Sequence, residues 1–301
     1  MPPSFLAAVG LGLRATFREP WLLAVGLVVG LARRAAVWPA LVVAWAVLLR
    51  SVLLAAARHP LQPRAPAEGI LAAVTAPRVV ALVAGLWLAG VAVGALLRVA
   101  YLAGALPTLA AAQAGTLGPR FAPGIAYGFA RVLAAAALGA VLDLSGGLFG
   151  GTLALAAFRI TGRASELGGS PLLAAAVALA LVLALAVPLA LSAVADAAVA
   201  RAAVRGDGPA HAFVESGGRF LARPGSFLLG AISFGVLAAV VPWIVTGAGS
   251  IATGFATTVN PAVLLGPQLM IAVVAGTVGA GVDLVWLGTV AALACGEEPQ
   301  G

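Results

Sequence analysis

Long apolar runs recur along this chain and are separated by short segments that contain arginine. Crossing a bilayer takes about 20 consecutive apolar residues in a helix, because lipid offers the backbone no hydrogen-bond partners. With 62% hydrophobic and 9% charged residues, the chain also lacks the polar surface that a soluble protein of 301 residues needs. We therefore predict an all-α polytopic membrane protein, a bundle of about six transmembrane helices. The predicted spans are 21–57, 79–105, 132–158, 172–199, 225–246 and 268–295.

The first predicted span is interrupted by charge. Its opening run, Trp21 to Ala32, is too short to cross a bilayer alone, and Arg33 and Arg34 follow it. We predict one long, bent or tilted helix with a kink near Pro39, rather than two separate spans. The whole chain, 1–301, is predicted to form a single integral membrane domain.

Two short segments that precede spans carry a different pattern. In 207–223 the polar side chains recur every four residues, and the bulky apolar ones fall on the opposite side of a helix. In 4–18, two arginines likewise lie opposite a row of apolar side chains. Helices of this kind lie in the membrane interface with one face in lipid. We predict interfacial amphipathic helices at 4–18 and 207–223, with lipid contacts from Arg14, Arg18, Arg219 and Arg223.

A proline follows each of these segments and begins the next span. Pro20 and Pro224 fall at a first helical turn, where the missing N–H is least costly. Aligning the two prolines also aligns Gly26 with Gly230. A third, weaker copy consists of 67–76 followed by a proline and a span. The recurrence predicts an internal structural repeat.

Two stretches carry a resemblance to known proteins. FLAAVGLGLRATFREPWLL (5–23) and GPAHAFVESGGRFLARPGSFLL (208–229) resemble a loose group of bacterial polytopic membrane proteins. One example is the membrane domain that accompanies some glycerophosphodiester phosphodiesterases. The shared pattern is a short surface helix that ends in an aromatic and basic cluster, followed by proline and a span. The resemblance implies a bacterial inner-membrane protein, and it implies no catalytic residue, because that group's catalysis belongs to a separate domain.

The basic residues are all arginine: the chain has 17 arginines, no lysine and a formal net charge of +7. In a soluble protein this balance would indicate nucleic acid as a partner. Here the arginines lie mainly between spans, where they set orientation by the positive-inside rule. The arginine-rich segment 201–223 is therefore predicted to be cytoplasmic, and an even number of spans places both termini on that side too. Arg58, Arg64 and Arg78 then lie outside, which counts against this orientation.

Ionisable side chains near the middle of a span are the candidate functional residues. Each costs about 2.5–3.5 kcal/mol at a helix centre, so each requires a reason to be there. Asp143 and Asp283 lie near the centres of the third and sixth spans, and Arg98 lies in the inner half of the second. One interpretation is a proton or cation relay that Arg98 tunes. The other is structural: a buried pair of Arg98 with an aspartate, or protonated carboxyls bonded to neighbours such as Ser145 or Thr277.

Two further motifs invite a functional interpretation. The glycine pairs within 146–151 have the spacing of close helix packing, and they also suggest a locally broken helix that lines a cavity. Asn260-Pro261-Ala262 resembles the Asn-Pro-Ala signature of the aquaporin family. The sequence lacks a second copy, Val263 stands where that family carries an arginine, and Asn-Pro is also an ordinary turn.

Enzymatic function is not predicted. The two histidines, His59 and His211, lie in different loops, and no nucleophile–base set or metal-ligand spacing occurs. We predict no catalytic residue, no metal and no cofactor. The predicted function is a non-enzymatic scaffold or accessory component, whose partners are membrane lipids and other membrane subunits rather than nucleic acid. The alternative is a small transporter or channel that uses Asp143 and Asp283; it requires a polar cavity there, whereas a scaffold packs both sites dry.

Overall fold

The computed structural model describes residues 3–58, 64–116, 120–162, 171–254 and 265–296. These residues are almost entirely helical and none of them forms a strand, so the predicted all-α class is confirmed. Six of their helices are long and apolar enough to cross a membrane, and each contains one predicted span. They are α2 (Trp21–Arg58), α4 (Pro77–Gln113), α5 (Phe121–Gly162), α6 (Pro171–Val204), α8 (Pro224–Gly254) and α9 (Leu265–Cys295).

The helices are longer than the predicted spans because a helix does not end where its apolar composition ends. The second predicted span stops at 105, but α4 continues through Pro107 to Gln113. Leu106 and Leu109 are buried in this extension, so packing against neighbouring helices stabilises it. The first span is a single helix, α2, with Pro39 inside it.

The chain divides into two compact units. One comprises 1–26 with 99–301, and the other comprises 27–98, so α2 and α4 contribute to both. In the unit 27–98, α2 and α4 approach closely, since a Cβ added to Gly90 would meet the carbonyl oxygen of Ala36. With α3 (Ala65–Thr75) they border a groove of about 360 Å³, lined by alanine, valine and leucine side chains and by Trp87.

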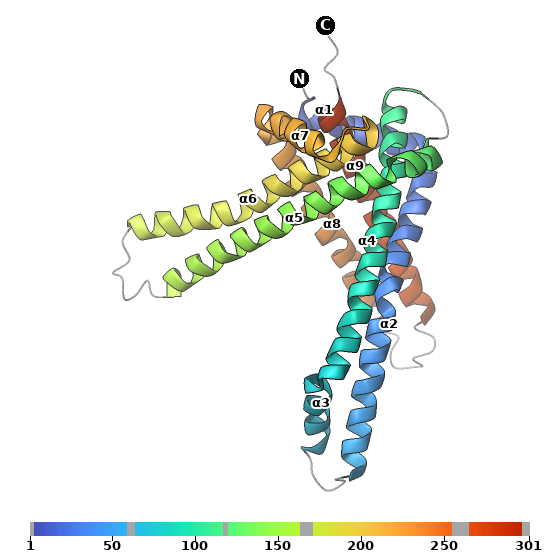
Figure 1. Cartoon of the computed structure of the whole chain (residues 1–301), viewed down its shortest axis with the longest axis vertical. Coiled ribbons are helices and arrows are strands. Elements are labelled where there is room, and N and C mark those ends of the chain that lie inside the picture. The colour runs from blue at the N-terminus through green and yellow to red at the C-terminus, as the bar shows by residue number, and fades with distance from the viewer. Residues whose placement is uncertain (1–2, 59–63, 117–119, 163–170, 255–264, 297–301) are drawn as a thin grey trace. The chain divides into compact units, whose positions relative to one another are not determined.

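The larger unit is built on pairs of neighbouring helices. α5 and α6 lie side by side, α8 packs on α9, and two short helices, α1 (Phe5–Arg18) and α7 (Pro209–Ala222), pack on α9 and α6 respectively (Figure 1). Small residues make the closest of these contacts. A Cβ added to Gly12 of α1 would lie 2.7 Å from the carbonyl oxygen of Val285, so the α1–α9 crossing requires glycine.

The prediction that the glycine pairs break the third span is wrong. α5 is an unbroken helix from Phe121 to Gly162. Gly146 and Gly150 face α6, where a Cβ on Gly150 would lie 2.5 Å from the carbonyl oxygen of Ala184 and 2.8 Å from Cγ of Pro188. The glycines therefore make room for α6 and its proline ring rather than for a cavity.

The two short helices confirm that the predicted interfacial segments are helical. The way in which these helices end supports the predicted repeat. Each ends in a residue of similar backbone conformation: Glu19 has φ −123° and ψ 61°, and Arg223 has φ −144° and ψ 64°. The third junction differs, because Ala76 has φ −69° and ψ 112°. α1 and α7 leave Phe17 and Leu221 exposed, which suits lipid contact, and their position at an interface stays a prediction.

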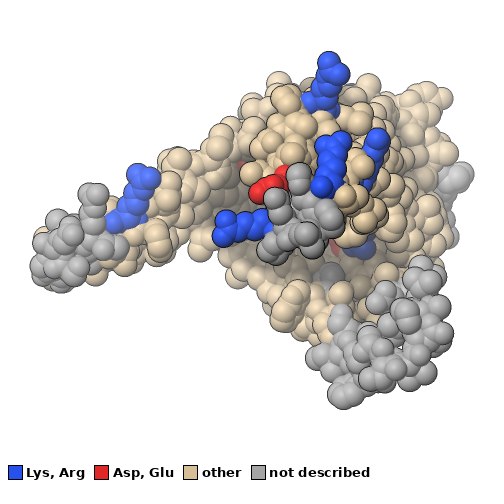
Figure 2. All heavy atoms as spheres, turned by 90° about the horizontal axis from the view of Figure 1, so that it is seen from below, with Lys and Arg blue, Asp and Glu red and all other residues tan. Residues whose placement is uncertain are grey.

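The outer surface is largely apolar. On the face in Figure 2, charged side chains are few and scattered among other residues. Trp38 and Trp243 are 63% and 77% exposed, which is costly in water and ordinary in lipid. The Asn260-Pro261-Ala262 motif lies outside the described residues.

Candidate functional site

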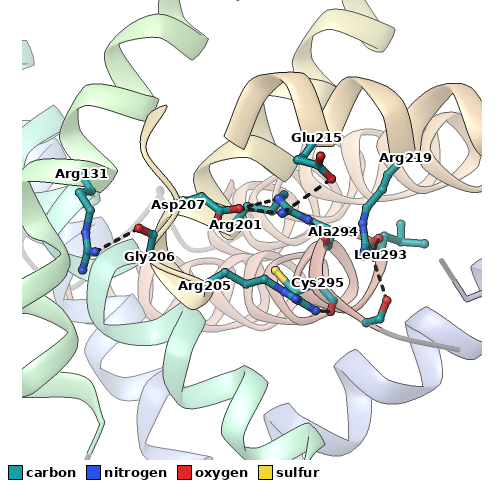
Figure 3. Close-up of polar contacts among 11 residues, drawn as sticks. Arg131, Arg201, Arg205, Gly206, Asp207, Glu215, Arg219, Leu293, Ala294 and Cys295 are labelled. Atoms are coloured by element: carbon teal, nitrogen blue, oxygen red, sulfur yellow. Dashed lines mark hydrogen bonds and ion pairs between the residues drawn. The ribbon is translucent and has the colours of Figure 1, made fainter. Parts of the chain in front are cut away.

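Three arginines of the larger unit converge on the carboxyl-terminal end of α9 (Figure 3). The last carbonyls of a helix have no partner within the helix, and that end carries a partial negative charge. Guanidinium groups donate hydrogen bonds to these carbonyls, and their positive charge offsets the partial negative charge. Arg201 donates to the carbonyl of Ala294 (3.3 Å), Arg205 to that of Cys295 (2.6 Å), and Arg219 to those of Leu293 (3.4 Å) and Gly296 (2.9 Å). α6 and α7 thereby hold the end of α9.

Arg201 is the most buried of these arginines, and an acidic partner compensates its charge. Its Nε and Nη2 atoms lie 2.9 Å and 2.7 Å from Oδ2 of Asp207, and the two side chains are only 6% and 17% exposed. Glu215 of α7 lies farther away, at 3.9 Å. Asp207 follows Gly206, whose φ of +72° favours glycine, and Arg131 of α5 donates to the Gly206 carbonyl at 3.1 Å. The turn is thus fixed to α5 and α6.

Arg219 and Arg18, predicted to contact lipid, are also bonded to helix ends. Arg18 donates to the carbonyl of Ala112, in the last turn of α4, at 2.7 Å. Burial, and then the charges of Arg201 and Arg205, lower the pKa of Arg219. An arginine nevertheless stays protonated in a protein, so the charge at the end of α9 is retained. Lipid contact by Arg14, Arg18, Arg219 and Arg223 stays a prediction.

A cavity whose mostly apolar wall contains three polar side chains lies between α6, α8 and α9 in the same unit. It has a volume of about 250 Å³, and its lining includes Ser192 and Asp196 of α6 and Asp283 of α9. Two aromatic rings, Phe234 and Trp286, also line it, and its other wall residues are alanine, glycine, valine and leucine. Asp283, predicted from its depth in a span, is therefore at a cavity rather than in dry packing.

Trp286 is fixed in the cavity wall from three directions. Its Nε1–H donates to Oδ2 of Asp196 at 3.0 Å. Its ring packs on Phe234, with the ring centroids 5.4 Å apart and the planes 36° from parallel. A Cβ added to Gly230 would lie only 2.7 Å from Cζ3 of the indole, so the ring occupies the space that this glycine leaves. The cavity thus combines carboxylates with a positioned aromatic wall.

Asp143 connects to the same cavity through Ser192. The Asp143 side chain on α5 is hydrogen-bonded to Ser192, which lines the cavity from α6. Asp143 therefore faces another span. The predicted partners Ser145 and Thr277 bond elsewhere, because they donate to carbonyls of their own helices at 2.7 Å and 2.8 Å. The two predicted aspartates thus lie on either side of one serine-bearing helix.

Helix geometry gives the depth of this site. At ~1.5 Å per residue, Asp283 lies ~15 Å along α9 from Leu293, and Asp196 lies ~7 Å along α6 from Arg201. The hydrocarbon core of a bilayer is about 30 Å thick. We expect the arginine-bonded helix ends to lie at its edge, and the cavity would then extend from near that edge to the middle of the membrane.

Arg98 belongs to a different unit from the two candidate aspartates. It ends the unit 27–98, whereas Asp143 and Asp283 both belong to the other unit. Its predicted meeting with an aspartate stays a prediction.

The sequence analysis did not identify Ser192, Asp196, Trp286 or Phe234. A signal was available: Ser192 and Asp196 are four residues apart, and Asp283 and Trp286 are three apart, so each pair shares one helix face. The missing information was which faces of α6 and α9 meet. Comparisons with protein-family models, with curated proteins and with solved structures give no match for this chain.

Proposed function

We propose that this membrane protein is a small transporter that moves a cation through the cavity between α6, α8 and α9. The observation that carries the proposal is the presence of Asp283 and Asp196 in the wall of one cavity, which is bordered by three of the helices that are long and apolar enough to cross a membrane. Carboxylates in this position are costly in lipid and are typical of ion and proton pathways. The Asp143–Ser192 hydrogen bond extends the polar route to α5. The proposed role is not enzymatic.

The proposal assigns distinct tasks to the three aspartates. Asp283 lies farther than Asp196 from the arginine-bonded helix ends, and it carries the cation at mid-membrane. Asp196 lies nearer the arginine-bearing end and exchanges the cation with water on that side. Asp143 takes up or releases a proton through Ser192, so that cation movement is coupled to proton movement. We place the protein in a bacterial inner membrane, in line with the resemblance of its helix–proline–span segments.

Flux in reconstituted vesicles tests this function. The purified full-length protein is placed in liposomes that contain a pH-sensitive dye, and proton flux is followed after a sodium or potassium gradient is imposed. We expect flux above that of empty liposomes, and its loss in Asp283→Asn. Glu68→Gln is the matched control, because Glu68 is an acidic residue of α3 outside the cavity. Equal flux in protein-containing and empty liposomes, or full flux in Asp283→Asn, would contradict the proposal.

A second candidate, the scaffold or accessory component, draws support from the unit 27–98. Its groove of about 360 Å³ is lined only by apolar side chains, which suits packing against a helix of another membrane protein. Purification in mild detergent followed by mass spectrometry tests this role. A stoichiometric membrane partner that is lost in Ala44→Trp, a substitution that fills the groove, would support it. Isolation of the protein alone from native membranes would count against it.

A further inference from the structure

We propose that α2 binds an anionic phospholipid on one of its faces. This tryptophan face consists of Arg34, Trp38, Leu41, Val42 and Trp45. The headgroup phosphate lies on the arginine, and an acyl chain lies along the two tryptophans. The site belongs to the unit 27–98 and is independent of the transport function proposed above. It follows from the depth of the arginine, from the shape of the face and from its length.

Arg34 lies at a level of its unit where the apolar stretch of the helices ends. On α4 the charge-free stretch 79–97 is flanked by arginine on both sides, and Arg98 is the second of the two. This stretch is ~28 Å long at ~1.5 Å per residue, close to the hydrocarbon thickness of about 30 Å. Arg33 lies at the same end, because a Cβ added to Gly94 would be 3.7 Å from its side chain. Arg34 is therefore at the edge of the hydrocarbon, where lipid phosphates lie.

Arg34 is also available to a ligand, whereas its neighbour Arg33 lies against α4. The Arg34 side chain is exposed, and no hydrogen bond or ion pair joins it to another residue within the described parts of the chain. In this it differs from Arg201 and Arg219, which are bonded to the end of α9. A guanidinium binds two phosphate oxygens through parallel hydrogen bonds, so a phosphate matches this arginine in charge and geometry.

The face next to the arginine is apolar and hollowed. Trp38 and Trp45 follow Arg34 by four and eleven residues, a spacing that keeps all three on one side of a helix. The two tryptophans are 63% and 69% exposed. Between them is a depression of about 300 Å³, which they line together with Leu41 and Val42. An acyl chain suits this surface, because both are apolar and neither needs a hydrogen-bond partner.

The length of the face matches a phospholipid in one leaflet. Trp38 lies ~6 Å from Arg34 along the helix axis, at the interfacial level that indole rings prefer. Trp45 lies ~16 Å from Arg34, which is close to half of the hydrocarbon thickness, ~15 Å. One anionic group at the edge and a chain of this length are what a phospholipid provides. An apolar helix of a partner protein would leave the charge of Arg34 uncompensated.

Photolabelling of the purified full-length protein in phosphatidylcholine liposomes tests this site. Two probes carry the same photoreactive group in one acyl chain: phosphatidylglycerol, which is anionic, and phosphatidylcholine, whose net charge is zero. Trypsin cuts after arginine, so mass spectrometry measures the label on the peptide that contains 35–50. We expect about 5-fold more label there from the anionic probe, the factor that one arginine near an anionic headgroup contributes.

Substitution of the arginine should remove this preference. Arg34→Gln should give equal label from the two probes, whereas Arg34→Lys keeps the charge and should retain most of the preference. Arg50→Gln is the matched control and should behave as the wild type does. Arg50 is an exposed arginine of the same helix, and it lies about 120–140° around the axis from Trp38 and Trp45.

A variant that fills the depression tests the position of the chain. Val42 lies between the two tryptophans and is 58% exposed, so Val42→Trp occupies the depression without entering the packed interior. We expect it to reduce the preference for the anionic probe although Arg34 is retained. The thermal unfolding temperature of Val42→Trp and of Arg34→Gln should equal that of the wild type, which separates loss of the site from loss of folding.

Three results would overturn the inference. The first is equal label from the two probes in the wild type. The second is an undiminished preference in Arg34→Gln or in Val42→Trp. The third is the absence of label from either probe on the peptide that contains 35–50, because the tryptophan face would then be covered by protein rather than by lipid.

Discussion

At the scale of single residues, charged groups in this protein are few, and their contacts decide what they contribute. Arg14 and Arg201 look alike in the sequence, as arginines near the end of an apolar stretch. In the structure Arg14 is exposed, whereas Arg201 is 5% exposed and bonded to a carboxylate and a helix end. A buried arginine is tolerated only where such acceptors offset its lost hydration.

Removal of Arg201 should be strongly destabilising. Arg201→Ala leaves Asp207 without its main partner in a mostly buried position, and it leaves the carbonyl of Ala294 without a donor. We expect a loss of about 3–5 kcal/mol in the free energy of unfolding, as for other broken buried pairs. Thermal unfolding in detergent measures the change. Arg50→Ala, at an exposed position of α2, is the control and should change stability by less than about 0.5 kcal/mol.

Ser192 should affect flux although it carries no charge. Ser192→Ala removes the hydrogen bond to Asp143 and one polar group of the cavity wall. We expect proton-coupled flux to fall about tenfold, in line with the loss of one hydrogen bond to a charged group. Ser145→Ala is the matched control, since Ser145 donates only within α5. Equal flux in the two variants would remove Ser192 from the proposed route.

The sequence alone singles out Asp143 and Asp283 as candidates, because a carboxylate at a helix centre is costly wherever its helix lies. It could not identify Ser192 or Trp286 in the same way. Serine and tryptophan are common in membrane helices, and their roles depend on which helix faces them. Arg219 is a similar case. The sequence pattern places it on the polar side of a helix, but the unpaired carbonyls of α9 determine where its side chain goes.

At the scale of helices, backbone patterns were more predictable than helix contacts. Pro20 and Pro224 correctly mark breaks, because proline starts a helix readily and rarely continues one. The aligned glycines also share a role, since a Cβ on Gly26 would lie 2.9 Å from the Tyr101 hydroxyl and a Cβ on Gly230 would lie 2.7 Å from the Trp286 ring. By contrast, the glycines of 146–151 were ambiguous, because the same spacing serves packing or a break.

Adjacent glycines of α5 offer a sharp test of the α5–α6 packing. Gly150→Ala places a Cβ 2.5 Å from the Ala184 carbonyl oxygen, whereas Gly151→Ala meets no atom within 4 Å. We expect Gly150→Ala to lower the free energy of unfolding by about 1–3 kcal/mol, because a packed backbone must move apart. Gly151→Ala should be neutral or slightly stabilising, since alanine favours a helix more than glycine does. Reversed effects would show that another face of α5 meets α6.

At the scale of the whole molecule, the number of spans is predictable and the grouping of helices is not. Apolar length is a local property that each segment carries by itself. The division between 27–98 and the rest cuts through α2 and α4 inside continuous helices, where neither a proline nor a turn marks a domain boundary in the sequence. Grouping depends on which helix faces meet, and those faces are nearly uniform runs of alanine, leucine and valine.

The arrangement of the whole chain across the membrane gives the last prediction. Three spans, α4, α5 and α6, separate Arg64 from His211, so these exposed positions should lie on opposite sides of the membrane. The arginine-rich side that contains Arg201, Arg205 and Arg219 should be cytoplasmic by the positive-inside rule. Single cysteines, Arg64→Cys and His211→Cys, are introduced into a Cys295→Ser background and exposed to an impermeant thiol reagent in intact cells.

We expect Arg64→Cys to react in intact cells and His211→Cys to react only after permeabilisation, while the cysteine-free parent reacts in neither case. The reverse pattern would leave the number of spans unchanged and overturn the predicted orientation. Arg58, Arg64 and Arg78 already count against that orientation, because it places them outside the cytoplasm. Reaction of both positions from the same side would mean that α4, α5 or α6 does not cross the bilayer. The cavity and its aspartates would then no longer lie within a complete set of spans, and the transport proposal would lose its physical basis.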